Sequence, residues 1–358
     1  MIILHINSIK KPEGNGVAEA IKCYSYYEGI NNTVAVYSLN KSLGLKNMKE
    51  FCSDDYSAIS QLPEPFNEPD LIVFNEVYKL EYLRLYKECS NNGIPYVIIP
   101  HGCLVNIAQK KRKIKKIVGN FLFFNRFIRR ASAIQFLNKE EKESTKFKYN
   151  KYIISGNGIE LHPSKRISPK NNDLIYIGRY SIYHKGLDLL VDICHRNKEW
   201  FINNHVQIRL FGRPSRADLD ELNKMTKKLG VSTIVNINGP VYGEDKIKIL
   251  KESYGFIQVS RHEGQPMGII EALAYGLPCI VTTGTNFKDY VNNNKCGYGV
   301  DFNDKQIMDA IKELYRDRTR RNEMSNNALK CAAESFKWNS IIDKLLDDYN
   351  DLIETEKK

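Results

Sequence analysis

The sequence predicts an α/β fold made of two Rossmann-like domains that face each other across a central cleft. A chain of 358 residues is too long for one comfortable core and suits two domains of about 150–180 residues each. Short apolar runs alternate with helical segments along most of the chain, which is typical of a parallel sheet. The polar, Pro-containing stretch 163–172 interrupts this pattern, which then restarts. We therefore expect an N-terminal domain over 1–165, a C-terminal domain over 166–335, and a final helix within 336–358 that packs back toward the N-terminal domain.

The predicted strands are apolar runs, and the predicted helices fill the gaps between them. In the first half, strands are expected at Ile2–Ile6, Thr33–Tyr37, Asp70–Phe74, Tyr96–Ile99, Ala133–Leu137 and Tyr152–Ile154, with helices that include Val17–Tyr27 and Leu80–Asn91. In the second half, strands are expected at Asp173–Gly178, Gln207–Gly212, Thr233–Ile237, Gly255–Val259 and Pro278–Val281. The helices there are expected at Gly186–Lys198, Asp218–Leu229, Glu244–Lys251 and, as a closing amphipathic helix, Asn339–Leu352. Ligands of such sheets bind at the carboxyl ends of the strands.

Composition points to a folded cytoplasmic protein with a basic surface. The eight cysteines are scattered without a Cys-x-x-Cys pair, which fits reduced, packed thiols and argues against a structural metal. The first residues read as a strand and not as a signal peptide, and no segment approaches the roughly 18–20 apolar residues of a membrane span. The net charge of +11 favours phosphates, an anionic membrane or nucleic acid as partners.

The positive charge is concentrated in one segment. No Asp or Glu occurs from Cys89 to Lys139, while residues 109–130 interleave many cations with apolar side chains, namely Ile117, Phe121, Leu122, Phe124 and Phe127. One interpretation is an amphipathic stretch that lies on an anionic membrane surface, at the inner face of the plasma membrane. The other is a pair of helices that pack on the core and leave a basic face in water. The sequence does not choose between them.

The most informative motif lies between the last two predicted strands. Glu263 and Glu271 are eight residues apart, the first in a loop and the second about one turn into a short helix. Gly264 and Gly268 lie between them, where the helix begins. A helix N-terminus offers unpaired N–H groups and a positive dipole end to an anion. A site that binds phosphate and also carries two carboxylates suggests a sugar attached to a nucleotide.

Three motifs, in this order and spacing, resemble those of retaining glycosyltransferases of the GT-B fold, in particular the family 4 (group 1) type. The resemblance is strongest over about residues 173–300 and weaker over the first half. The motifs are Tyr176-Ile-Gly-Arg179 with His184-Lys185-Gly186, Asn238-Gly-Pro-Val241 before a short helix, and Glu263-x7-Glu271 followed by Ala-Leu-Ala-Tyr-Gly-Leu-Pro. The resemblance implies a nucleotide-sugar donor as substrate, bound by the C-terminal domain over 166–335, and an acceptor bound by the N-terminal domain over 1–165.

The resemblance also implies roles for the charged residues. Arg179 and Lys185 would neutralise the donor diphosphate and stabilise charge on the leaving group, for which two cations in one loop are suited. Glu271 would accept hydrogen bonds from the ribose hydroxyls, and Glu263 would lie by the donor sugar. For Glu263 a simple helix-capping role is the alternative.

Further donor contacts follow from the same resemblance. Residues 264–269 would line the donor site, although Gln265-Pro266-Met267-Gly268 stands where the family more commonly has Phe-Gly-Leu-Pro, so individual sugar contacts cannot be transferred. These candidate donor-binding residues are Gly264, Gln265, Pro266, Met267, Gly268 and Ile269. Gly239 and Val241 would touch the nucleobase. Residues 282–286 either present N–H groups to the pyrophosphate or form only a turn.

Two candidates lie in the first half. Gly16, in Glu13-Gly-Asn-Gly16 directly after the first strand, allows close approach of the backbone to the donor phosphates. His101, in Pro100-His101-Gly102 at the end of a buried strand, resembles the family's His-Gly at the cleft. It would contact the transferred sugar or position the acceptor hydroxyl. A packing role is the alternative for His101, and a plain tight turn the alternative for Gly16.

The expected reaction is metal-independent transfer of a hexose-type sugar, with retention, from a nucleotide diphosphate to an acceptor hydroxyl. Uridine is the base that the family suggests, so UDP is the expected product and no cofactor is needed. The acceptor would be a saccharide or lipid-linked saccharide in bacterial surface polysaccharide or glycolipid assembly. Alternatives are a GT-B epimerase or phosphorylase, a two-carboxylate glycosidase, a nicotinamide-dependent dehydrogenase and a basic nucleic-acid-binding protein. A glycosidase would have no use for the basic pair, the phosphate loop and the doubled α/β pattern. The dehydrogenase would need a third glycine that Glu13-Gly-Asn-Gly-Val-Ala-Glu19 lacks. No recognised nucleic-acid-binding motif is present, so no nucleic-acid partner is expected.

Overall fold

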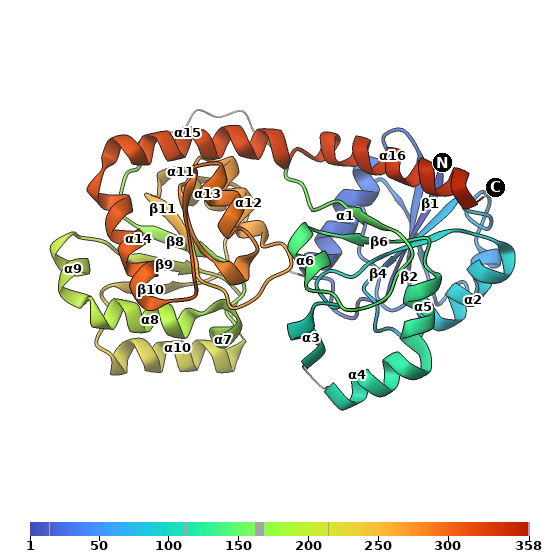
Figure 1. Ribbon diagram of the computed structural model, residues 1–358, viewed down its shortest axis with the longest axis horizontal. Coiled ribbons are helices and arrows are strands. Elements are labelled where there is room, and N and C mark those ends of the chain that lie inside the picture. Colours follow the sequence, from blue (N-terminus) through green and yellow to red (C-terminus); the bar gives the residue numbers. More distant parts are fainter. Residues whose placement is uncertain (14, 111–112, 162–167, 214, 357–358) are drawn as a thin grey trace. The chain divides into compact units, whose positions relative to one another are not determined.

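The computed structural model of the protein describes residues 1–13, 15–110, 113–161, 168–213 and 215–356. The chain forms two compact units, which we call the first unit (residues 1–158 and 338–358) and the second unit (residues 159–337). The boundary expected at 165/166 falls among residues 162–167, which lie outside the described ranges. Each unit is a parallel sheet with helices packed against it (Figure 1).

The sheet of the first unit has seven strands among the described residues, in the order β3-β2-β1-β4-β5-β6-β7. The strands are β1 Ile2–Asn7, β2 Thr33–Ser38, β3 Lys49–Cys52, β4 Leu71–Asn75, β5 Tyr96–Ile99, β6 Ala133–Phe136 and β7 Tyr152–Ile154. The helices are α1 Gly16–Glu28, α2 Tyr82–Asn92, α3 Asn106–Lys110, α4 Lys113–Gly119, α5 Asn125–Arg130, α6 Lys139–Glu143 and α16 Trp338–Glu356, with a 3₁₀ turn η1 Ile59–Gln61 and a π-helical turn η2 Asn120–Phe124.

Both faces of this sheet are buried, as expected of parallel strands covered by helices. In β1, Leu4 and Ile6 enter one core cluster, whereas Ile3 enters the cluster on the opposite face. The C-terminal helix α16 belongs to that second cluster. Its Trp338 ring stacks on Tyr27, with the ring centroids 5.5 Å apart. The end of the chain thus completes the core of the first unit.

The second unit repeats the plan with six parallel strands among its described residues, ordered β10-β9-β8-β11-β12-β13. They are β8 Leu174–Ile177, β9 Ile208–Phe211, β10 Val235–Asn238, β11 Gly255–Gln258, β12 Cys279–Thr282 and β13 Gly297–Val300. The helices are α7 Ile182–Lys185, α8 Leu187–Arg196, α9 Lys198–Asn203, α10 Arg216–Lys228, α11 Gly243–Glu252, α12 Met267–Ala274, α13 Lys288–Asn293, α14 Asp304–Arg316 and α15 Arg318–Ser335, with a 3₁₀ turn η3 Thr283–Thr285.

The strands expected from the sequence occur within two residues of their expected bounds, and the structure adds two that were not expected, β3 and β13. Both lie at a sheet edge, where a strand does not need a continuous apolar run. In β13, Gly297 and Gly299 hide the strand pattern. A Cβ on Gly297 would lie 2.0 Å from the Cys279 carbonyl oxygen, so close packing on β12 requires the glycine.

Candidate active site

Several candidate residues of the second unit lie beyond the carboxyl ends of strands of the same parallel sheet. Arg179 follows β8, Gly239 follows β10, and Glu263 lies in the loop after β11. Because the strands are parallel, these loops all emerge at the same end of the sheet, where the strands have their carboxyl ends. In the first unit, Gly16 and His101 hold comparable positions after β1 and β5.

Lys185 lies at this end of the sheet because Gly186, the next residue, allows the backbone to pack closely there. α7 ends at Lys185, and Gly186 takes the left-handed conformation with φ +67°. A Cβ on Gly186 would lie 2.0 Å from the Val259 carbonyl oxygen, so a larger residue could not pack here without a shift of the backbone. The backbone amide of Arg261 also donates to a carbonyl oxygen in α7, at 3.0 Å. Backbone packing therefore brings the Lys185 ammonium to the loop that carries Glu263.

Glu263 is held by three donors. Its Oε1 lies 2.5 Å from Lys185 Nζ, 2.7 Å from the Ser260 hydroxyl and 3.0 Å from Gln258 Nε2. The ion pair is largely buried, with 13% of the Lys185 side chain and 9% of the Glu263 side chain exposed. Helix α12 begins after Pro266 without a side-chain cap, so the capping alternative for Glu263 is not observed. The three donors instead fix the orientation of the carboxylate, which lies beside a cation at the carboxyl end of the sheet.

The loop between Glu263 and α12 is anchored from two sides. Asn286, in left-handed conformation after β12, donates from Nδ2 to the carbonyl oxygens of Glu263 and Gly264, at 2.8 and 3.1 Å. Gly268, in the first turn of α12, packs so tightly that a Cβ would lie 2.6 Å from the Ile177 carbonyl oxygen. The N-terminus of α12 is thus drawn against the end of β8. No side chain caps its first amides, and uncapped amides at a helix N-terminus are able to bind an anion.

Glu271 forms a second ion pair with a residue that sequence reasoning missed. Its Oε1 lies 2.5 Å from Lys246 Nζ, and both side chains are about one quarter exposed or less. Lys246 lies in α11, the short helix that follows the Asn238–Val241 motif. The two carboxylates therefore have different cationic partners. The sequence signal that could have revealed this partner was a lysine near the start of the helix that follows the Asn238–Val241 motif.

Arg179 differs from Lys185 in its surroundings. Its side chain is exposed, and its carbonyl oxygen accepts a hydrogen bond of 3.0 Å from the buried Tyr176 hydroxyl, which fixes the backbone there. Among the described residues, no carboxylate forms an ion pair with the Arg179 guanidinium. Such a cation can bind an incoming phosphate without first losing a protein partner.

The proposed nucleobase loop begins at a fixed strand end. The Tyr180 hydroxyl donates to the Asn238 carbonyl oxygen at 2.6 Å, which anchors the last residue of β10. Gly239 follows in open space, since no atom lies within 4 Å of a Cβ built there. Val241 packs partly against the apolar cluster around α12. Packing therefore does not explain the glycine at 239, whereas it does explain the valine at 241.

A pair of histidines also lies beside Glu263. The rings of His184 and His262 are 4.1 Å apart between centroids. Burial lowers the pKa of His184 to about 4, with the charge of Lys185 adding to the effect and that of Glu263 opposing it. His184 is therefore neutral at pH 7. Sequence reasoning assigned neither histidine a role.

In the first unit, Gly16 begins α1. The Asn15 side chain caps this helix by accepting from the Val17 amide at 2.9 Å. No atom lies within 4 Å of a Cβ built on Gly16. Packing therefore does not require a glycine at this position, and the close approach of donor phosphates to Gly16 stays a prediction. Gly14 of the same motif lies outside the described residues.

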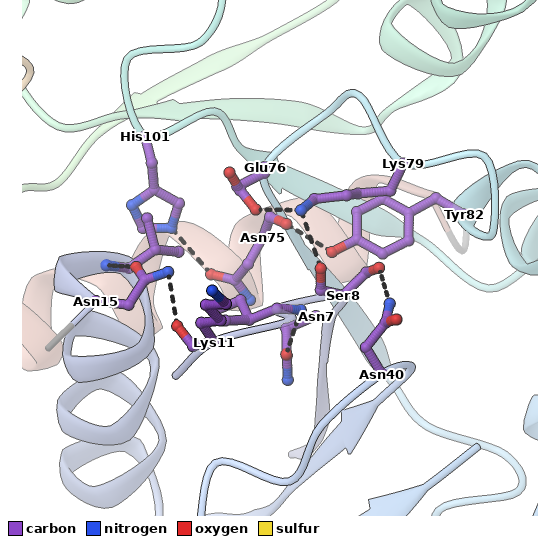
Figure 2. A network of polar contacts seen from close by, with 12 residues as sticks. Asn7, Ser8, Lys11, Asn15, Asn40, Asn75, Glu76, Lys79, Tyr82 and His101 are labelled. Carbon is purple, nitrogen blue, oxygen red and sulfur yellow. Dashed lines mark hydrogen bonds and ion pairs between the residues drawn. The ribbon is translucent and has the colours of Figure 1, made fainter. Parts of the chain in front are cut away.

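His101 belongs to a polar network at the carboxyl ends of β1, β4 and β5 (Figure 2). It has φ +50°, an uncommon conformation for a residue other than glycine. Its Nε2 lies 3.1 Å from Asn75 Oδ1, and burial lowers its pKa to about 3. The next residue, Gly102, donates its amide to Oε1 of the buried Glu141 at 2.5 Å. Neither Asn75 nor Glu141 was predicted from the sequence.

The basic segment 109–130 divides into an exposed and a buried part. Phe124 and Phe127 are buried in the core of the first unit, whereas a run of apolar residues in α4 and η2 faces solvent. This run, which we call the α4–η2 patch, consists of Ile114, Ile117, Val118, Phe121, Leu122 and Phe123. Ile114 is 79% and Phe121 82% exposed. In the part of the chain that the structure describes, no helix meets the length and apolarity needed to span a membrane.

Comparison with known proteins places these features in context. Residues 159–330 match the family model described as glycosyl transferases group 1. The chain is 25% identical over 223 residues to O-antigen chain mannosyltransferase C of Escherichia coli, a match that covers 58% of this chain and 56% of that protein. It is 20% identical over 341 residues to the GDP-mannose:cellobiosyl-diphosphopolyprenol alpha-mannosyltransferase of Xanthomonas campestris, covering 90% and 85% of the two chains.

A solved structure extends the similarity to the whole fold. The Anabaena protein Alr3699/HepE in complex with UDP and glucose superposes with a TM-score of 0.74 at 16% identity, covering 98% of this chain and 100% of that one. The chain thus spans about half the length of the first of the two curated relatives and most of the second.

Proposed function

This chain belongs, through residues 159–330, to the glycosyl transferases of group 1 and has the GT-B type of fold, and on that premise we propose that it transfers a hexose from a nucleotide diphosphate to an acceptor hydroxyl. The observation that carries the proposal is the Lys185–Glu263 pair next to the uncapped N-terminus of α12. A carboxylate, a cation and a helix N-terminus able to bind an anion therefore lie together at the carboxyl end of the second sheet. These groups suit a sugar joined to a diphosphate.

In the proposed site, Arg179 and Lys185 have different roles. Arg179 binds the diphosphate, and its guanidinium stabilises the negative charge that develops as the sugar departs. Lys185 is neutralised by Glu263 in the structure, so its contribution depends on that pair. Glu263 in turn accepts hydroxyl hydrogen bonds of the donor sugar through the oxygen that is not held by Lys185, Ser260 and Gln258.

Glu271 is proposed to bind the ribose hydroxyls, with Lys246 holding the carboxylate in place. The nucleobase would lie against Gly239 and Val241. Uridine is the base that the sequence resemblance suggests, and GDP-mannose is a second candidate because the Xanthomonas campestris relative is named for it. A thermal-shift panel of UDP-glucose, UDP-galactose and GDP-mannose separates the two, since a bound donor raises the melting temperature. If none of them does so, the proposed donor class is wrong.

Retention of anomeric configuration and independence of metal ions are part of the proposal. The leaving phosphate would help to deprotonate the acceptor on the same face of the sugar, so no enzyme nucleophile is needed. Arg179 would supply charge that a metal ion supplies elsewhere. The anomeric form of the product, read by NMR from a labelled donor, tests retention. Activity that is lost in EDTA and restored by Mg²⁺ would contradict metal independence. Product analysis also separates transfer from epimerisation or phosphorolysis.

The acceptor is proposed to be a lipid-linked saccharide at the inner face of the plasma membrane. The two curated relatives are named for an O-antigen chain and a diphosphopolyprenol-linked acceptor. The α4–η2 patch supports membrane contact, because exposed apolar residues beside Lys115 and Arg126 match the pattern of an interfacial helix.

Vesicle sedimentation tests this contact. The wild type should sediment with anionic vesicles at low salt, and Ile114→Ser with Phe121→Ser should abolish most of the binding. Leu80→Ser is the matched control, because Leu80 is an exposed apolar residue of the same unit outside the patch. Equal binding of wild type and double variant would show that the patch is not the membrane surface.

A further inference from the structure

Asn75 has a defined amide orientation. Its Nδ2 lies 3.3 Å from the Ile6 carbonyl oxygen and 3.4 Å from the Val73 carbonyl oxygen. A carbonyl oxygen can only accept a hydrogen bond, so the amide nitrogen must face this side. The residue is 1% exposed, and its own carbonyl oxygen accepts from the Tyr82 hydroxyl at 2.6 Å. Its Oδ1 is therefore directed to the opposite side, toward His101 (Figure 2).

This orientation determines the protonation of His101. Oδ1 of Asn75 can only accept, and it lies 3.1 Å from His101 Nε2, so Nε2 carries the proton. Burial lowers the pKa of His101 to about 3, so the ring is neutral at pH 7. The second nitrogen, Nδ1, then has a lone pair. Among the described residues, Nδ1 has no hydrogen-bond partner, and the residue as a whole is only partly buried.

A second pair of buried side chains lies behind Asn75. His5 Nδ1 is 3.5 Å from Asn75 Nδ2, and His5 Nε2 is 2.6 Å from Glu28 Oε2. Both His5 and Glu28 are completely buried. Burial of an ionisable pair such as His5 and Glu28 costs desolvation free energy that the pairing only partly offsets, and Glu28 Oε1 has no hydrogen-bond partner among the described residues. Three buried polar side chains lie behind a histidine whose backbone has the left-handed conformation. Because an apolar core would pack as well, this arrangement indicates that the orientation of the His101 ring matters.

We infer that Asn75 is a positioning residue: it holds His101 in the tautomer with the proton on Nε2, so that Nδ1 accepts a hydrogen bond from a hydroxyl group of the substrate. This inference rests on the proposed function and on the role that the family resemblance implies for His101, contact with the transferred sugar or with the acceptor hydroxyl. The tautomer itself can be measured without any substrate. A failure of the proposed function therefore leaves the tautomer testable, and the reverse also holds.

Nitrogen NMR measures the tautomer directly. The protein has seven histidines, so ¹⁵N-histidine labelling gives few signals, and the His101 signals are those lost in His101→Gln. We expect a pyridine-like shift for Nδ1 and a pyrrole-like shift for Nε2. In Asn75→Leu, which removes the acceptor at similar volume, the Nδ1 signal should move toward the pyrrole-like value. A pyrrole-like Nδ1 in the wild type would overturn the inference, as would unchanged shifts in a folded Asn75→Leu.

Two substitutions of His101 give an independent test should Asn75→Leu fail to fold. Asparagine places an oxygen near the position of Nδ1, whereas glutamine places its amide near Nε2 and keeps the contact with Asn75. Cleavage of UDP-glucose or GDP-mannose to the nucleoside diphosphate in water is the probe. We expect His101→Asn to be about tenfold more active than His101→Gln, which is the effect of one hydrogen bond on the rate. Equal activities, or the opposite order, would mean that the bond to Asn75 is structural only.

Discussion

The contact between Gly186 and the end of β11 leads to a quantitative prediction for Gly186→Ala. Two effects act on the folded state. The left-handed conformation, with φ +67°, costs an alanine about 1 kcal/mol. The new Cβ would also lie 2.0 Å from the Val259 carbonyl oxygen, where ordinary contact begins at 3.4 Å. Relieving this overlap needs a backbone shift, and overpacking of this kind costs about 1–3 kcal/mol. We expect a total loss of about 2–4 kcal/mol.

Gly230→Ala is the matched control. Gly230 has φ +64° in the same unit, but the nearest atom to a built Cβ is the flexible end of Lys198, at 3.5 Å. This variant therefore carries only the conformational cost of about 1 kcal/mol. Both variants share one unfolding unit, so any departure from two-state behaviour affects them alike.

Urea unfolding, followed by circular dichroism, gives the difference between the two variants as a shift of the midpoint at unchanged slope. Gly186→Ala should unfold at clearly lower urea than Gly230→Ala. It should also lose donor-induced thermal stabilisation, because the shift moves Lys185 away from Glu263. Equal midpoints for the two variants would refute the reasoning, since the clash would then contribute nothing.

Three further predictions concern charged groups. Lys185→Met should lower stability by roughly 1–3 kcal/mol, because a largely buried carboxylate loses its cation; urea unfolding measures this, and an unchanged midpoint contradicts it. Lys246→Met should weaken donor binding about tenfold through the loss of its bond to Glu271, whereas Lys248→Met, an exposed lysine of the same helix, should not; equal affinities by calorimetry would exclude the role. Finally, the pKa of His101 is depressed to about 3, so below about pH 6.5 the unfolded chain binds a proton that the folded chain does not. The wild type should therefore lose stability relative to His101→Gln as the pH falls from about 6.5 toward 3, with no such change above 6.5; parallel stability curves over this range would contradict the depressed pKa.

Local pattern was sufficient to predict the parallel strands and their order along the chain. Buried parallel strands need continuous apolar runs, and these are visible in the sequence, as in Tyr96–Ile99. The same logic failed for β3 and β13. Edge strands bury less, and β13 owes its place to glycines that pack closely on β12. The resemblance to group 1 glycosyltransferases also came from motifs that are contiguous in the sequence.

The sequence alone determined the fold class, the candidate carboxylates and the loops that carry them, because each depends on residues close together in the chain. Only the tertiary structure decided which cation each carboxylate meets. Lys185 pairs with Glu263 across 78 positions, and Lys246 with Glu271 across 25. It likewise brought Asn75 to His101, from a different strand. Such pairs depend on which strand ends become neighbours and on close backbone contacts such as that of Gly186, and no local spacing encodes either.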